Sequence, residues 1–210
     1  MDDTALDQAL IAAGFAQIAA RGWHRFNVAE AAREAGLPLE RARRRIGCRA
    51  QFLTRFGRLA DTAALTGADT EGPTRDRLFD MLMRRIDALQ THRDGVIALL
   101  KAVPLDPPAA LLLANASLTS MGWLLAAAGL EAGGPMGQLR RKALLAVWLW
   151  TVRAWQTDTS EDLAATMAAL DQALDKAEHV AGWLRGARKE DQGAPPPGPP
   201  PGAEPLDLMP

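Results

Sequence analysis

Four arginines stand together in one short segment near the start of the chain. Residues 39–46 read Leu-Glu-Arg-Ala-Arg-Arg-Arg-Ile, and the arginines are Arg41, Arg43, Arg44 and Arg45. A guanidinium group presents a planar fork of donors that matches phosphate oxygens and guanine edges. Because clustered cations repel one another unless a polyanion lies nearby, this segment predicts contact with DNA.

The same segment has the pattern of a two-sided helix. At about 3.6 residues per turn, Leu39, Ala42 and Ile46 fall on one side, and the arginines fall mainly on the other. We expect the apolar side to pack inward and the arginines to point outward together, as a basic ridge.

The elements around the arginines predict a helix-turn-helix. Asn27 is a plausible N-cap for a helix over 28–35, Gly36 makes the turn, and Pro38 suits the first turn of the next helix. Helix, tight turn and basic helix together are typical of a DNA reader. Arg49, just after this unit, is expected to contact the DNA backbone together with Asn27.

Charge is distributed unevenly along the chain. From Arg21 to Arg58 there are ten basic and three acidic residues, whereas from Asp61 to the end there are fourteen basic and nineteen acidic residues; the whole chain carries −1. A basic head on an acidic body is expected of a DNA-binding module joined to a regulatory one. A solvated charged surface is the alternative.

Composition predicts an all-α fold. The 210 residues are 48% hydrophobic, tyrosine is absent, and helix-period patterns recur throughout. We expect a head over residues 1–60, a helical body over 61–187 and a disordered proline-rich tail over 188–210. The expected helices are 3–20, 28–35, 38–47, 50–64, 74–90, 93–103, 107–128, 136–157 and 161–186.

Residues 107–130 contain no charged side chain. This length prompts a membrane-spanning interpretation, but two prolines begin the segment, and Asn115 and Thr119 interrupt it. We therefore expect no membrane span, and a helix buried at the centre of the body. No N-terminal signal is apparent, and Cys48 has no cysteine to pair with, so we expect a cytoplasmic protein.

Large apolar side chains in the body predict a pocket for a small hydrophobic ligand. The alternative for the tryptophans is plain core or dimer interface. The predicted pocket residues are Met83, Asn115, Thr119, Met121, Trp123, Trp148 and Trp155. A stripe of Leu163, Met167, Leu170 and Leu174 on the last helix indicates self-association, so we expect a homodimer through the last two helices.

Catalysis has little support in the sequence. His24, His92 and His179 have no metal-ligand spacing, and no glycine-rich phosphate loop follows a strand. Cys48 lies beside the basic helix, where cations favour a thiolate, but an ordinary surface residue accounts for it as well. We expect no enzyme activity, metal or cofactor.

The head resembles the N-terminal domain of TetR-family transcriptional repressors. Residues 15–23 (Phe-Ala-Gln-Ile-Ala-Ala-Arg-Gly-Trp), 28–36 (Val-Ala-Glu-Ala-Ala-Arg-Glu-Ala-Gly) and 49–52 (Arg-Ala-Gln-Phe) carry the resemblance. It implies a dimer whose body encloses a ligand pocket and whose heads bind a double-stranded DNA operator. Arg43 stands where the family has an aromatic residue that touches a phosphate.

The body is similar to the lipid-binding accessory protein of coenzyme Q biosynthesis. The similarity lies in 77–89 (Arg-Leu-Phe-Asp-Met-Leu-Met-Arg-Arg-Ile-Asp-Ala-Leu), in 139–158 and in 166–171. That family has a TetR-like fold, dimerises and binds isoprenoid lipids. The leading hypothesis from the sequence is a ligand-responsive repressor, and the alternative is a lipid-binding protein whose head does not read DNA.

Overall fold

A computed structural model describes residues 2–69 and 71–193, with side chains given as far as residue 179. The described residues form helices and loops without a strand, which confirms the all-α prediction. The α-helices are α1 (Asp3–Arg21), α2 (Val28–Glu34), α3 (Leu39–Arg45), α4 (Arg49–Leu65), α5 (Thr74–Gln90), α6 (Arg93–Ala102), α7 (Pro107–Ala127), α8 (Gly134–Thr157) and α9 (Ala164–Gly193).

Most helix ends lie close to their predicted positions because local capping determines them. Asn27 caps α2 through its side-chain oxygen, and Asp106 caps α7 by accepting from the backbone N–H of Ala109. The exception is α9, which continues to Gly193 and so includes residues 188–193 that we assigned to the tail. The rest of the predicted tail, 194–210, lies outside the described residues.

Aromatic rings fill the core of the head. Phe52 of α4 lies 4.6 Å from Phe26 and 5.1 Å from Phe15, measured between ring centroids. Gly14 of α1 makes room for it, since a Cβ there would lie 2.3 Å from a ring carbon of Phe52. The bulk of Phe52 and the absence of a side chain at residue 14 together set how closely α1 and α4 approach.

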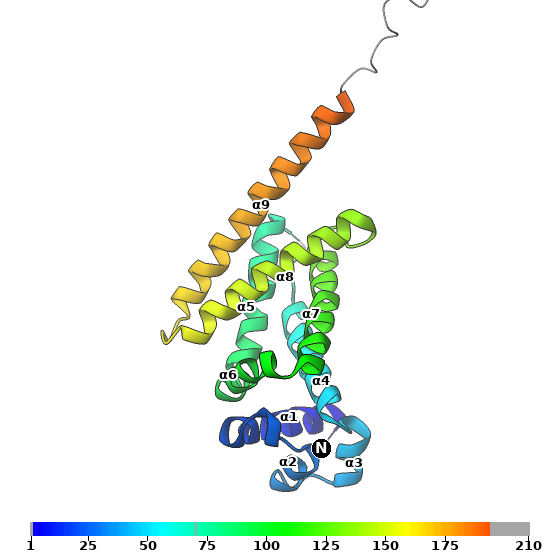
Figure 1. Cartoon of the computed structure of the whole chain (residues 1–210), viewed down its shortest axis with the longest axis vertical. Helices are drawn as coiled ribbons and strands as arrows, with labels where there is room; N and C mark the ends of the chain where they lie inside the picture. Colours follow the sequence, from blue (N-terminus) through cyan, green and yellow to red (C-terminus); the bar gives the residue numbers. More distant parts are fainter. Residues whose placement is uncertain (1, 70, 194–210) are drawn as a thin grey trace, which may run out of the picture.

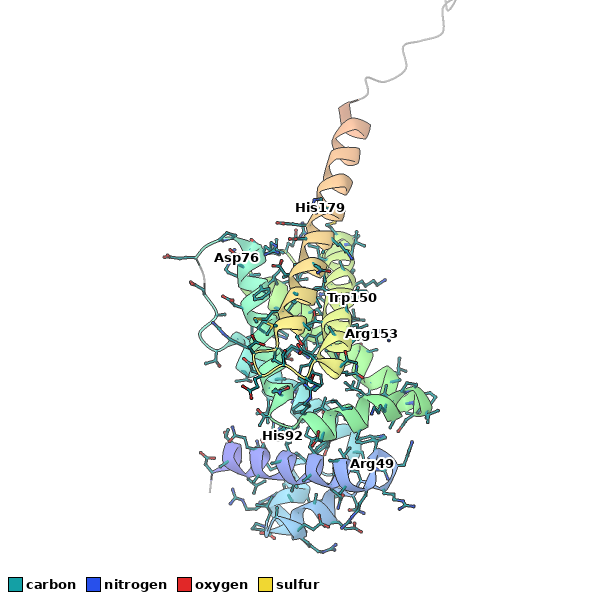
Figure 2. The ribbon with its side chains drawn as sticks, turned by 90° about the vertical axis from the view of Figure 1, so that its left-hand side faces the viewer. Arg49, Asp76, His92, Trp150, Arg153 and His179 are labelled. Atoms are coloured by element: carbon teal, nitrogen blue, oxygen red, sulfur yellow. The ribbon has the colours of Figure 1, made fainter. Side chains whose placement is uncertain are left out.

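The head and the body are joined by a continuous helix and by a packed contact. Helix α4 runs through residue 60, the predicted boundary, and α1 lies across the end of the body (Figure 1). A Cβ on Gly95 of α6 would lie 2.4 Å from the carbonyl oxygen of Phe15. His92 stacks on Phe15 at 5.3 Å in this junction (Figure 2).

In the body, α8 and α9 form a long antiparallel pair that extends away from the head (Figure 1). Leu170 and Leu174 of α9 are buried, and so is Leu163, the residue just before this helix. The apolar stripe predicted to bind a second copy is therefore largely used within the chain, where it packs on the body.

Helix α7 lies along one side of the body (Figure 1) and not at its centre. It is long and apolar enough to span a membrane, with mean hydropathy 1.5, but such a helix is weak evidence, and 33% of its apolar window is buried. Leu111 is 73% exposed and Trp123 is 64% exposed. The prediction of a central buried helix is wrong because α7 packs on α4 and α8 on one flank, whereas its opposite flank is exposed in the part of the chain that the structure describes.

Candidate functional site

Two of the four arginines of α3 are turned toward α1. Arg45 donates through Nε and Nη2 to the two carboxylate oxygens of Asp7, at 2.9 and 2.5 Å. Arg55 of α4 reaches the same carboxylate at 2.6 Å. The side chain of Asp7 is only 4% exposed, so this carboxylate holds three helices together.

A second carboxylate of α1 extends the pairing. Asp3 accepts from Arg41 at 3.0 Å and from Arg45 at 3.1 Å. The hydrogen bond from Arg41 and the charge of Arg45 lower the pKa of Asp3 below its ordinary value. Asp3 and Asp7, together with the arginines that they bind, form what we call the α1 clamp.

The clamp corrects the prediction of a basic ridge that points outward as a unit. Three carboxylates precede the basic stretch that begins at Arg21: Asp3 and Asp7 lie in α1, and Asp2 is its N-cap. Residues 1–60 contain ten arginines and six carboxylates, a net charge of +4. Two of those carboxylates fold directly onto α3, so Arg41 and Arg45 already have anionic partners within the chain.

The exposed part of α3 is mixed in character. Arg43 and Arg44 are exposed, and Arg43 donates to the carbonyl oxygen of Gly47 at 3.4 Å. Leu39, expected to face inward, is 40% exposed, and Glu40 beside it is also exposed. In helix-turn-helix proteins the first residues of the second helix contact base edges; here those positions present a leucine and a carboxylate.

The two predicted backbone-contact residues have structural partners. The Asn27 side-chain oxygen accepts from the backbone N–H of Ala29 at 2.9 Å and of Glu30 at 3.3 Å. Arg49 donates to carbonyl oxygens of the loop before α2, and its guanidinium lies 5.7 Å from the centre of the Trp23 ring. A hollow of about 440 Å³, lined in part by Asn27, Arg43 and Arg49, lies between these groups.

Trp155, a predicted pocket residue, is a core residue that joins three helices. It is fully buried, and its indole N–H donates to Gln90 at 2.8 Å. The Arg93 guanidinium lies 4.9 Å from its ring centre and donates to the carbonyl oxygens of Trp155 and Asp158 at the end of α8. These contacts join α5, α6 and α8.

The other predicted pocket residues lie in different environments. Met121 is fully buried, Trp148 is nearly so, and Met83 is half-buried. Asn115, Thr119 and Trp123 lie on the exposed side of α7. The predicted set is thus divided between the core and the surface, because residues 121 and 123 point to different sides of one helix.

Sequence reasoning missed a buried ionic cluster beside Trp148. Arg85 of α5 pairs with Asp61 of α4, and the Ser120 hydroxyl of α7 donates to the same carboxylate at 2.6 Å. The Arg85 guanidinium lies 4.8 Å from the Trp148 ring centre, and burial lowers the pKa of Arg85. An arginine beside Ile86, on the otherwise apolar face of α5, was the available signal.

Within the described residues, no group of three or more histidine, cysteine or carboxylate side chains is arranged to hold a metal ion. No family model and no curated protein matches the chain. Among solved structures, a protein from Mesorhizobium loti titled as a TetR-family transcriptional regulator matches with a TM-score of 0.51. The match has 13% identity and covers 86% of this chain and 98% of that one. The chain therefore has a TetR-like fold.

Proposed function

We propose that this protein binds an apolar, lipid-like molecule of the isoprenoid kind and that its head is not a DNA reader. The observation that carries the proposal is α7. It holds no charge over 21 residues, and it exposes Leu111 and Trp123 on a flank that the other described residues do not cover. Exposed apolar patches of this kind are typical of sites for apolar ligands or partners.

The α1 clamp supports the part of the proposal that says the head is not a DNA reader. For Arg45 to bind a phosphate, it would have to leave Asp7, whose side chain is buried. Arg45 would lose its two charge-assisted hydrogen bonds to Asp7, and Asp7 would keep Arg55 as a partner. A phosphate contact on DNA has to offset that loss, and the exposed Glu40 adds repulsion.

The proposed binding of a lipid-like molecule is supported by a resemblance in residues 77–89 and 139–158. These residues are similar to a lipid-binding accessory protein of coenzyme Q biosynthesis. The same family forms dimers. We propose that this chain forms a homodimer through the outward face of α8, where Leu139, Leu149 and Trp150 are exposed. Trp150 and Arg153 lie along α8 beside α9 (Figure 2). The proposal includes no catalytic step and no cofactor. We also propose that the protein is cytoplasmic.

A ligand-responsive DNA-binding regulator is the second candidate. The exposure of Arg43 and Arg44 and the +4 charge of the head favour it. Regulation would then require a ligand that binds the DNA-incompetent state more tightly than the competent one.

Two measurements on the purified full-length chain separate the candidates. Mass spectrometry of an organic extract is expected to find a retained lipid or quinone. Selection from genomic DNA fragments at low salt is expected to find no specific site. A dimer with eight phosphate contacts would instead lose affinity with a log–log salt slope of about −7. Specific binding that Arg44→Ala abolishes would refute the proposal.

A further inference from the structure

The arginines of the body are, as a rule, matched with acceptors. Arg75 binds Asp171 and Asp175 of α9 at 2.7 Å each, and Arg85 binds Asp61. Arg141 of α8 departs from this rule. Its side chain is half-buried, its Nε is wholly enclosed, and among the described residues it has no hydrogen bond, ion pair or ring contact.

The chain makes room for this guanidinium on α7. A Cβ on Gly122 would lie 2.9 Å from the Arg141 Nε, 3.0 Å from Cζ and 3.2 Å from Nη2. Gly122 is buried, and Met121 before it is fully buried. Because any larger residue would displace the guanidinium, the glycine keeps the Nε–Nη2 edge of Arg141 against the α7 backbone.

The position of Arg141 on α8 excludes the proposed dimer face as the source of its partner. Residues three and seven apart on a helix share a face. Arg141 precedes Leu144 by three residues and Trp148 by seven, and both are buried on the inward side. Leu149 and Trp150 lie on the opposite, exposed side. An anion that meets Arg141 therefore enters the seam between α7 and α8.

A half-buried guanidinium without a counter-ion loses hydration and gains nothing in return. Nε faces Gly122 and is enclosed, so the end of the guanidinium that an anion can reach is the one that carries Nη1 and Nη2, whose N–H groups match the two oxygens of a carboxylate. We propose that Arg141, seated on Gly122, binds the carboxylate headgroup of an amphiphilic ligand whose apolar chain lies along α7. This inference rests on the proposed function and names the ligand class for it.

The test compares two probes of equal chain length, dodecanoate and dodecanol, by calorimetric titration of the full chain at pH 8. Charge-assisted hydrogen bonds are expected to give wild type a roughly ten- to hundredfold preference for dodecanoate. Arg141→Gln is expected to remove that preference. Arg140→Gln is the matched control, because Arg140 is the neighbouring residue and donates to the carbonyl oxygen of Glu131; it is expected to keep the preference.

Gly122→Ala provides a variant that leaves Arg141 in the sequence but displaces its guanidinium. It is expected to reduce the preference for dodecanoate while the protein stays helical by circular dichroism. If Arg141→Gln does not fold, Gly122→Ala and Arg141→Lys replace it in the test. Lysine keeps the charge but lacks the pair of parallel N–H donors, so Arg141→Lys is also expected to reduce the preference for dodecanoate.

The outcomes distinguish the two proposals. Equal affinity of wild type for the two probes, or an unchanged preference in both Arg141→Gln and Gly122→Ala, overturns the role of Arg141 and leaves the apolar ligand standing. Binding of neither probe overturns the proposed function as well.

Discussion

Replacing Asp7 by asparagine removes the charge at the centre of the α1 clamp. The Asp7 carboxylate is nearly enclosed and binds both Arg45 and Arg55. In Asp7→Asn the two guanidinium groups would face each other across a neutral amide. We therefore expect a loss of stability and, at the same time, a release of Arg45 from α1.

The size of the effect follows from the burial of the three partners. Removal of one partner from a fully buried pair costs about 3–5 kcal/mol. The side chains of Arg45 and Arg55 are 29% and 25% exposed, so water can solvate them in part. We expect Asp7→Asn to lower the free energy of unfolding by about 2–3 kcal/mol, or a Tm lower by roughly 4–12 °C.

The matched control is Glu40→Gln, which changes the head by the same unit of charge at an exposed position of α3. Surface substitutions of this type usually change stability by less than about 0.5 kcal/mol. Urea unfolding followed by circular dichroism measures both variants. If Asp7→Asn is as stable as Glu40→Gln, the clamp does not hold α1 and α3 together and our account of the head is wrong.

DNA binding by the same two variants tests whether the clamp suppresses it. If the pairing with Asp7 keeps Arg45 from phosphate, Asp7→Asn should bind random duplex DNA at low salt more tightly than Glu40→Gln does. Equal affinities would mean that the clamp has no bearing on DNA binding.

Three further predictions concern the head–body junction and the start of α9. Burial lowers the pKa of His92 below its ordinary value of 6.5, so the unfolded chain takes up a proton at a higher pH than the folded chain does. The contribution of His92 to stability is therefore full above about pH 6.5 and falls as the pH drops below that value. The stability difference between wild type and His92→Gln should change with pH in that range. A pH-independent difference would contradict this. Asp158→Ala removes an acceptor of hydrogen bonds from Ser160 and Thr166 and should lower the free energy of unfolding by about 2–3 kcal/mol at pH 7. Hydrogen bonds, chiefly from Ser160, lower the pKa of Asp158, so this loss of stability should shrink as the pH falls below about 3.8. Gly95→Ala should destabilise by about 1–3 kcal/mol because its Cβ meets the Phe15 backbone, whereas Gly57→Ala, which meets nothing, should stabilise the helix; two shifts of the same sign in thermal unfolding would argue against a tight junction.

The helices and their caps could be predicted from the sequence because the causes are local. Asn27 and Asp106 accept hydrogen bonds from the backbone within three residues of themselves. Gly22 and Gly36 have positive φ values where the helices before them end. From the periodic apolar residues between such signals, eight of the nine α-helices of the described residues could be predicted to within about two residues at each end, which is the scatter that helix termini ordinarily show.

The direction in which each side chain points was a different matter. Arg45 and Asp7 are 38 residues apart, and their pairing depends on the angle at which α3 crosses α1. That angle is set by the packing of buried residues such as Ile46 and Leu10, which lie too far apart in the sequence for a local pattern to relate them. For the same reason, an uncharged α7 could be predicted from composition, but not the bare flank that carries Trp123.

An all-α chain, a cluster of arginines on one short helix and an uncharged helix in the body could all be inferred from the amino-acid order. Which charges meet depends on how the helices pack: packing joins Arg45 to Asp7, places Arg141 on Gly122 and leaves Leu111 exposed. Helix formation is governed by hydrogen bonds and side-chain spacing within a few residues, whereas ion pairing and burial depend on how separate helices pack, so the second set of facts appears only once the helices are assembled.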